Sequence, residues 1–118
     1  MKLYLSHASN YDYQTELYQP LKTALPTDFD VFYPHDPENN GKYSKDILEN
    51  CDVVLAEVSS ASTGQGIELG WANAAGVKIV CFYKIGTQPS GAITHIAETI
   101  FEYSSTDDLS EKLVKLLR

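Results

Sequence analysis

The chain has 118 residues, which is enough for one domain around a single core and too few for two, so we expect one domain over residues 1–118. Hydrophobic residues make up 43% and charged residues 21%, proportions that are ordinary for a globular protein. The formal net charge of −7 argues against binding of nucleic acid or of an anionic membrane through bulk electrostatics. A small ligand, even an anionic one, is compatible with this charge if local N–H groups and hydroxyls hold it.

The start of the chain and the two cysteines favour a cytoplasmic location. Residues 1–5 are mostly apolar, but the chain turns polar at Ser6, so we expect no secretory signal. No apolar run approaches the length of a membrane span. Cys51 and Cys81 lie in or beside apolar runs without a C-x-x-C pattern, which is typical of buried thiols in a reducing compartment.

Short apolar segments and helical patterns alternate along the chain. We expect five strands, over residues 2–5, 29–33, 53–58, 78–83 and 100–103. Helical patterns separate or follow them, over residues 11–25, 44–50, 65–75, a turn at 93–97 and a last helix after residues 105–108. Polar, turn-rich loops occupy residues 34–42 and 85–92.

Individual residues indicate where these helices begin, bend and end. Pro20 predicts a kink or a restart in the first helix. Ser44 is the expected N-cap of the short second helix, with Asp46 in its first turn. Gly76 reads as the residue that stops the third helix, and Ser105 begins the cap of the last. The apolar positions expected to face inward from the first and last helices are Leu17, Leu21, Ala24, Leu25, Leu109, Leu113, Leu116 and Leu117.

Strands that alternate with helices imply a parallel sheet covered on both faces. Five strands at this length fit a flavodoxin-like, doubly wound α/β domain with strand order 2-1-3-4-5. In such a sheet a ligand binds where the strand order reverses, here between the first and third strands. That rule places residues 6–10 beside residues 59–68, so we expect both stretches to line one pocket.

Glu68 is the acidic residue that this topology brings to the expected pocket. It lies in the first turns of the third helix, where the helix dipole favours a negative charge and a carboxylate is well placed to act as a nucleophile or to stabilise a cation. A purely structural reading is that Glu68 only complements the dipole. The glycines at 64, 66 and 70 favour a functional reading, because each weakens a helix but allows a close backbone approach.

Familiar nucleotide and metal motifs are absent. The glycine spacing does not fit G-x-G-x-x-G, and neither the P-loop pattern nor G-x-S-x-G occurs. His7, His35 and His95 are scattered over loops without other ligands at metal-binding spacing, so we expect no metal site and no cofactor.

Hydroxyl groups surround the expected pocket. The loop before the third helix contains serines and a threonine, which are either ordinary loop residues or, at a helix N-terminus, partners for a phosphate or a sugar. Tyr4 is most simply a core aromatic residue of the first strand. If its side chain points into the crevice, its hydroxyl can hold Glu68 in place.

The segment AEVSSASTGQGIELGWANAAGVKI resembles the nucleoside 2-deoxyribosyltransferase superfamily, and is most similar to its 2′-deoxynucleoside 5′-phosphate N-hydrolases. The resemblance is strongest over residues 52–83. The shared pattern is an A-E-V strand, a Ser/Gly loop and G-x-E-L-G-x-A.

The resemblance implies roles for particular residues. The family's catalytic glutamate falls on Glu68, its first-strand tyrosine on Tyr4 and its catalytic aspartate nearest to Asp46. A serine that contacts the 5′-phosphate falls on Ser62. Substrate contacts are also expected from Ser6, Ser9, Gly64 and Gly66, while His95 and the loop over residues 85–92 are expected to close a neighbour's pocket in a homodimer.

The implied activity is cleavage of the N-glycosidic bond of (deoxy)nucleosides or their 5′-monophosphates through a glutamate nucleophile. The deoxyribosyl group then passes to water or to a second base, and Asp46 or a water protonates the leaving base.

Two alternatives stay open. LYLSHASNYD is similar to the opening segment of TIR domains, some of which cleave NAD at a glutamate. The second alternative is a non-catalytic nucleotide-binding or assembly module, although the carboxylate at Glu68 argues against it.

Overall fold

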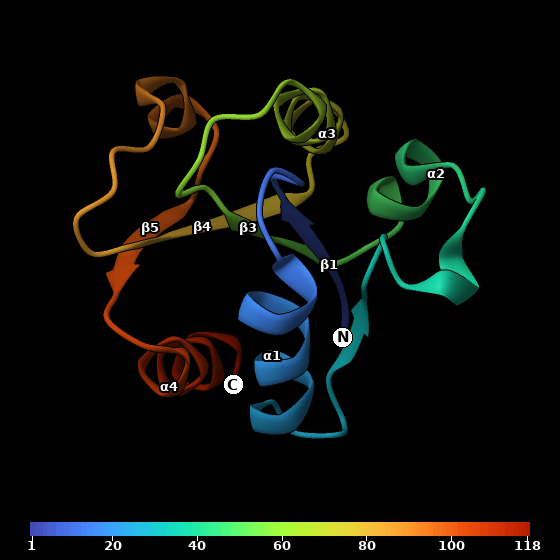
Figure 1. Ribbon diagram of the computed structural model, residues 1–118. Helices are drawn as coiled ribbons and strands as arrows, with labels where there is room; N and C mark the ends of the chain where they lie inside the picture. Colours follow the sequence, from blue (N-terminus) through green and yellow to red (C-terminus); the bar gives the residue numbers. More distant parts are fainter.

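The computed structural model describes residues 1–118 as one β-sheet with helices on both faces (Figure 1). All neighbouring strands are parallel, in the order β2-β1-β3-β4-β5. This is the flavodoxin-like order expected from the sequence, so the predicted fold class is confirmed. The strands are β1 (Lys2–His7), β2 (Asp30–Phe32), β3 (Val53–Glu57), β4 (Lys78–Lys84) and β5 (Thr99–Tyr103).

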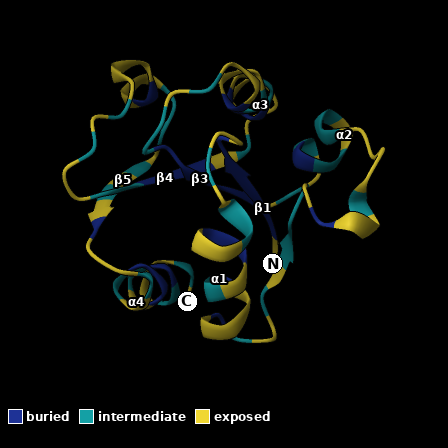
Figure 2. Cartoon of the chain, viewed as in Figure 1, coloured by how far each residue is buried: buried dark blue, intermediate teal, exposed yellow.

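Helices enclose the sheet on two sides, and Figure 2 shows β1, β3 and β4 as its most buried strands. One face is covered by the π-helical turn η1 (Gln14–Tyr18), α1 (Gln19–Ala24) and α4 (Thr106–Leu117). The other is covered by α2 (Ser44–Glu49), α3 (Thr63–Ala74) and the 3-10 turn η3 (Gly91–His95). A further 3-10 turn, η2 (Pro37–Asn39), lies in the loop after β2.

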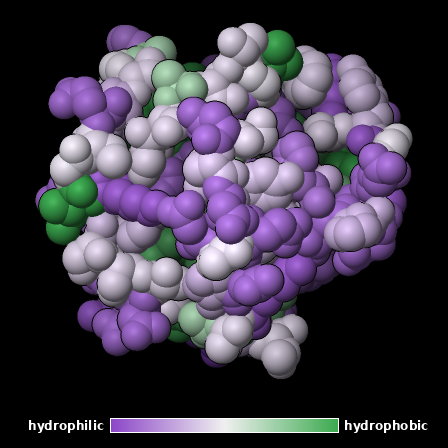
Figure 3. All heavy atoms as spheres, in the orientation of Figure 1, coloured by the Kyte–Doolittle hydropathy of each residue, from purple (hydrophilic) through white to green (hydrophobic).

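The outer surface is mainly polar on the face drawn in Figure 3, where apolar side chains form only small separate groups. Nowhere in the structure does a helix combine the length and the apolar character needed to cross a membrane.

Alternation along β1 decides which residues reach which face of the sheet. Leu3 and Leu5 enter the core beneath α1 and α4, whereas Tyr4 enters the core beneath α2 and α3. The strand runs past its predicted end and includes Ser6 and His7. Ser6 therefore points to the α3 side, as Tyr4 does, and His7 points to the α1 side, as Leu5 does.

Pro20 marks a change of helix type, in agreement with the predicted restart. The N–H of Gln19 donates to the carbonyl of Gln14, which closes the wide π turn where α1 begins. Because Pro20 has no N–H to donate, the change of turn at this point avoids a missing helical hydrogen bond. The wide turn also changes the inward face, so Tyr18 is buried and Ala24, which was expected inside, is exposed.

Three other expectations about the helices are wrong. Ser44 is the first residue of α2 rather than its cap, because Tyr43 occupies the cap position without a side-chain hydrogen bond. Helix α3 begins at Thr63, two residues early, because Ser62 caps it with its side chain. Leu116 is exposed because it lies beside the edge strand β5, beyond which no further strand covers it.

The remaining end signals agree with the structure. Gly76 follows α3 with φ of +76°, a conformation that favours glycine. Ser105 caps α4 by accepting the backbone N–H of Asp108. Cys81 is buried as expected, and burial raises the pKa of its thiol to about 11. Cys51 is only half-buried, because it lies between α2 and β3 rather than within a strand.

Candidate active site at the carboxyl edge of the sheet

A cavity of about 520 Å³ opens between the end of β1, the start of α3 and the segment after β2. Residues 6–10 and 59–68, which the topology rule placed together, both contribute to its lining. The third wall, within residues 34–44, was missed because that stretch reads as an ordinary polar loop. The predicted site residues that line the cavity are Ser9, Ser62, Gly64 and Glu68.

The Glu68 carboxylate accepts two hydrogen bonds from β1. The Tyr4 hydroxyl donates to Oε2, and the Ser6 hydroxyl donates to Oε1 at 3.0 Å. Both donors are fully buried, and the Tyr4 ring stacks on Phe32 with the centroids 5.5 Å apart. Burial, and next the negative charge of Glu68, raises the pKa of Tyr4, so the phenol stays protonated and donates. Glu68 itself is half-buried, so the sheet orients a carboxylate that is still open to the cavity.

The strand rather than the helix dipole orients Glu68. Because α3 begins at Thr63, Glu68 is the sixth residue of the helix and lies beyond its first turn. The dipole effect falls off within that turn. The expectation that the helix N-terminus stabilises this charge is therefore wrong, and Tyr4 and Ser6 perform the orienting role.

The three glycines near Glu68 border open space. A Cβ atom added at Gly64, Gly66 or Gly70 would meet no other atom within 4 Å. The glycines therefore leave space beside α3, as the functional reading of Glu68 requires. Gly64 lines the Glu68 cavity, whereas Gly66 and Gly70 line a second cavity.

The second cavity, also about 520 Å³, lies between the start of α3 and η3 and has a partly apolar wall. Ser62 and Gln65 line both cavities. Ser62 Oγ accepts the backbone N–H of Gln65 at 3.4 Å, so its hydroxyl caps α3. This hydrogen bond does not use the hydroxyl proton of Ser62, so Ser62 can also donate to another partner.

Two predicted site residues, Asp46 and His95, do not line the Glu68 cavity. Asp46 is exposed on α2 and lines a different cavity with Lys2 and Asp30, at the amino ends of β1 and β2. This cavity and the Glu68 cavity share Lys42, and Asp46 lines only the former. His95 is exposed at the end of η3 and lines neither of the two 520 Å³ cavities.

His7, which the sequence did not connect to the site, forms part of the cavity wall. Its Nδ1–H donates to the Ala8 carbonyl at 2.7 Å, and its Nε2 accepts the Tyr18 hydroxyl at 2.6 Å. The backbone N–H of His35 donates to the Tyr18 oxygen at 3.1 Å, which leaves the phenol proton for His7. Burial lowers the pKa of His7 to about 4. His7 is therefore a neutral imidazole with both nitrogens occupied.

Tyr43, Trp71 and Ile67 add aromatic and apolar surface to the mainly polar lining of the Glu68 cavity. Tyr43 and Trp71 meet edge to face with ring centroids 6.0 Å apart, and Ile67 is 50% exposed. Lys42 is the only lysine in the lining. Of these residues, Trp71 could have been found from the sequence. It lies three residues after Glu68, and positions three apart on a helix share a face.

Comparison with known proteins gives structural relatives. No family model matches the chain, and no curated protein sequence does. The chain is similar to the CMP N-glycosidase BcmB of Clostridium botulinum, with a TM-score of 0.73, 20% identity and coverage of 98% of this chain and 99% of that chain. A conserved protein of Enterococcus faecalis V583 has a TM-score of 0.64 and 17% identity over 98% of both chains. A flavodoxin-like domain from Synechococcus sp. has a TM-score of 0.50 and 16% identity over 98% of this chain and 99% of that chain. These similarities establish a shared fold.

Proposed function

We propose that this protein cleaves the N-glycosidic bond of nucleosides or nucleotides, with Glu68 acting at the anomeric carbon. The observation that carries the proposal is a carboxylate held by two buried hydroxyls and open to a cavity of about 520 Å³. That volume lies in the range of small-molecule sites. Further support comes from the resemblance of the segment around Glu68 to the nucleoside 2-deoxyribosyltransferase superfamily, and from a structural neighbour described as a CMP N-glycosidase.

The chemistry suits a fixed carboxylate. Cleavage of an N-glycosidic bond passes through an oxocarbenium-like state with positive charge at C1′. Glu68 beneath that carbon stabilises the cation or bonds to it, and water or a second base then receives the sugar. Tyr4 and Ser6 already hold both carboxylate oxygens, so little reorganisation is needed as charge develops. In this scheme water protonates the leaving base, because Asp46 does not line the Glu68 cavity.

The lining of the cavity suggests an orientation for the substrate. In this proposal the sugar lies over Glu68 and the base lies against Tyr43 and Trp71. A 5′-phosphate, where the substrate has one, lies near Ser9 or the N-terminus of α3 at Ser62. We expect 2-deoxyribose to be preferred to ribose, because a 2′-hydroxyl destabilises the cation inductively and would crowd the hydrogen-bonded carboxylate.

A substrate panel tests the proposal. The protein is incubated with deoxynucleosides, their 5′-monophosphates, ribonucleotides and NAD, with and without an acceptor base, and released base is measured by chromatography. We expect base release from a deoxynucleoside or its monophosphate. Release without an acceptor identifies a hydrolase, and exchange only with an acceptor identifies a transferase. Cleavage of NAD alone would support the TIR-like alternative, and no turnover at high enzyme concentration would contradict the proposal and favour a binding module.

We also propose a homodimer or higher oligomer in which residues 85–92 and His95 of one chain close the cavity of its neighbour. His95 is exposed, and Ile85 in the same region is 59% exposed, so both are accessible to another chain. Light scattering at micromolar concentration should give at least the mass of a dimer. A monomer under these conditions contradicts this part of the proposal.

A further inference from the structure

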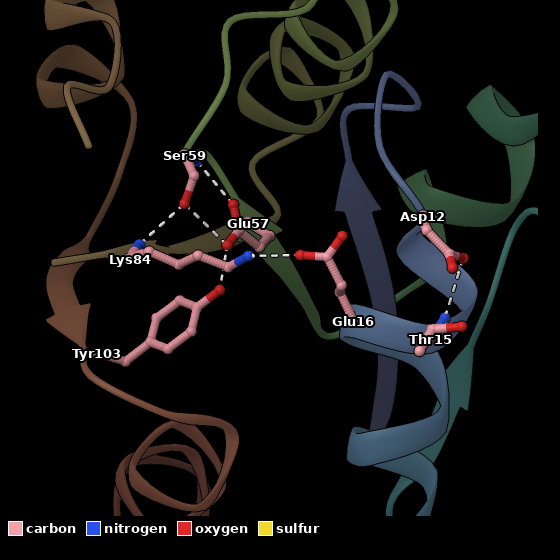
Figure 4. A network of polar contacts seen from close by, with 7 residues as sticks. All are labelled: Asp12, Thr15, Glu16, Glu57, Ser59, Lys84 and Tyr103. Atoms are coloured by element: carbon pink, nitrogen blue, oxygen red, sulfur yellow. Dashed lines mark hydrogen bonds and ion pairs between the residues drawn. The ribbon is translucent and has the colours of Figure 1, made fainter. Parts of the chain in front are cut away.

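A second carboxylate, Glu57, ends the central strand β3 on the face of the sheet opposite Glu68, and is 3% exposed. One of its oxygens accepts the backbone N–H of Ser59 at 2.7 Å. The other accepts the Ser59 hydroxyl at 2.9 Å and the Tyr103 hydroxyl (Figure 4). The Ser59 oxygen in turn accepts the backbone N–H of Lys84 at 2.9 Å. One side chain therefore connects the carboxyl ends of β3, β4 and β5.

Hydrogen bonds rather than a cation stabilise the Glu57 charge. Lys84, the lysine in this network, forms its ion pair with Glu16 at 3.0 Å, and none of the ion pairs in the structure includes Glu57 (Figure 4). Burial, and then the hydrogen bond to Glu57, raises the pKa of Tyr103, so its phenol stays protonated and donates. Burying a carboxylate is unfavourable unless it is fully hydrogen-bonded, and an apolar side chain would fill the space at lower cost. This arrangement points to a role beyond packing.

Glu57 holds both ends of the connection between β3 and α3. Its side chain binds Ser59, where the backbone leaves the sheet. Its backbone carbonyl accepts the side-chain Nε2–H of Gln65 at 2.8 Å, in the first turn of α3. The chain between these two attachments, residues 60–64, contributes to the lining of both 520 Å³ cavities.

We propose that Glu57 is a positioning residue, which holds residues 59–65 in the shape that binds a ligand in the Glu68 cavity. The Glu57 side chain acts through Ser59, and the backbone carbonyl of the same residue holds Gln65. Ser62, between these two attachments, borders the ligand space. The Glu68 carboxylate keeps its own hydrogen bonds from β1 when this connection loosens. Weaker binding at an unchanged kcat is therefore the expected signature. The identity of the ligand rests on the proposed function, whereas the shape of the connection does not.

Hydrogen-exchange mass spectrometry without ligand tests the positioning role directly. Glu57→Gln keeps the side-chain size but places an NH2 group where a carboxylate oxygen accepts. The buried peptides of β1 report any loss of global stability, and relative to them peptides covering residues 58–66 should exchange about tenfold faster than in the wild type. Tyr103→Phe, which removes one donor, should give a smaller change in the same peptides and replaces Glu57→Gln if that variant fails to fold. Tyr33→Phe is the matched control, because Tyr33 is a half-buried tyrosine on the same face without a hydrogen bond to Glu57.

Kinetics and binding complete the test. Trp71 is the only tryptophan and lines the cavity, so its fluorescence reports the binding of CMP or dCMP. We expect Glu57→Gln to raise Kd and KM about tenfold, or about 1.4 kcal/mol, and to leave kcat within about twofold. Unchanged exchange over residues 58–66 in both variants would overturn the inference, as would faster exchange spread evenly over all peptides. A wild-type protein that neither binds nor cleaves nucleotides contradicts only the proposed function, and the exchange comparison still decides the role of Glu57.

Discussion

Two carboxylates at the carboxyl edge of the sheet have matching partners and opposite surroundings. Glu68 accepts hydrogen bonds from the hydroxyls of Tyr4 and Ser6, and Glu57 accepts them from those of Tyr103 and Ser59. Glu68 is half-buried beside a large cavity, whereas Glu57 is 3% exposed. A carboxylate held by a tyrosine and a serine is therefore not a marker of chemistry by itself. Access for a ligand separates the candidate catalytic group from the structural one.

The covering elements explain the difference in access. On the α3 side, α2 has only six residues, and the cavity opens between it and α3. On the other side aromatic rings close the edge of the sheet, with Tyr13 and Tyr18 at centroid distances of 4.7 and 5.0 Å from His7. The same sheet thus presents one open and one closed face at the same edge.

The largest expected effect separates the two carboxylates by activity. Glu68→Gln keeps the size and one acceptor of the side chain but removes its charge, so cleavage should fall about 1,000-fold, or roughly 4 kcal/mol of barrier. The free energy of unfolding should change by less than about 1 kcal/mol, because the group is half-exposed. Steady-state kinetics and urea unfolding measure both quantities. Cleavage at the wild-type rate would refute the assignment of Glu68.

The converse substitution should act on stability. Glu57→Gln puts an amide among three donors in a closed site, so the free energy of unfolding should fall by about 2–3 kcal/mol. Urea unfolding measures this loss, and Lys84→Met, which keeps the backbone N–H that Ser59 accepts, is the control. If Glu57→Gln has the free energy of unfolding of the wild type, Glu57 is not the structural carboxylate that this comparison takes it to be.

The pH dependence of stability tests His7, which belongs to both regions because it pairs with Glu57 in register and lines the Glu68 cavity. Its pKa is lowered from 6.5 to about 4, so the folded protein binds fewer protons than the unfolded chain between these values. The contribution of His7 to the free energy of unfolding is therefore fully present above pH 6.5. It is lost as the pH falls toward 4, and the loss is at most about 3 kcal/mol. Urea unfolding from pH 7 to 4 should show a flatter profile for His7→Gln. His95→Gln, at an exposed position, should keep the wild-type slope, and equal slopes for all three proteins would contradict the assignment.

The smallest expected effects come from the two tyrosine donors. Tyr4→Phe removes one hydrogen bond to Glu68, so kcat/KM should fall about tenfold, or about 1.4 kcal/mol. Tyr103→Phe removes the matching bond to Glu57 and should lower the free energy of unfolding by about 1 kcal/mol with kcat unchanged. Parallel kinetics and unfolding of the two variants make the comparison. Similar losses of kcat in both would show that the two regions are not functionally distinct.

Much of the fold was predictable because its signals are local. The alternation of strands and helices predicted the parallel order 2-1-3-4-5, and Gly76 and Ser105 marked helix ends through their own backbone and side-chain preferences. The order of strands then placed the end of β1 beside the start of α3. The proximity of Tyr4 to Glu68 follows from that topology, and the structure shows the hydrogen bond between them.

Tertiary structure alone decided which side chains meet at the edge of the sheet. In the sequence Glu57 only interrupts an apolar run and Asp46 is a plausible partner of Glu68, yet Glu57 is the centre of a buried network and Asp46 lines a different cavity. The physical reason is geometric. A shift of one residue in the register of a strand moves each of its side chains to the other face of the sheet. A shift of one position along a helix turns a side chain by about 100° around the helix axis. Sequence alone therefore determines the sheet order and the approximate site, whereas strand ends, helix starts and packing across the sheet select the residues that form it.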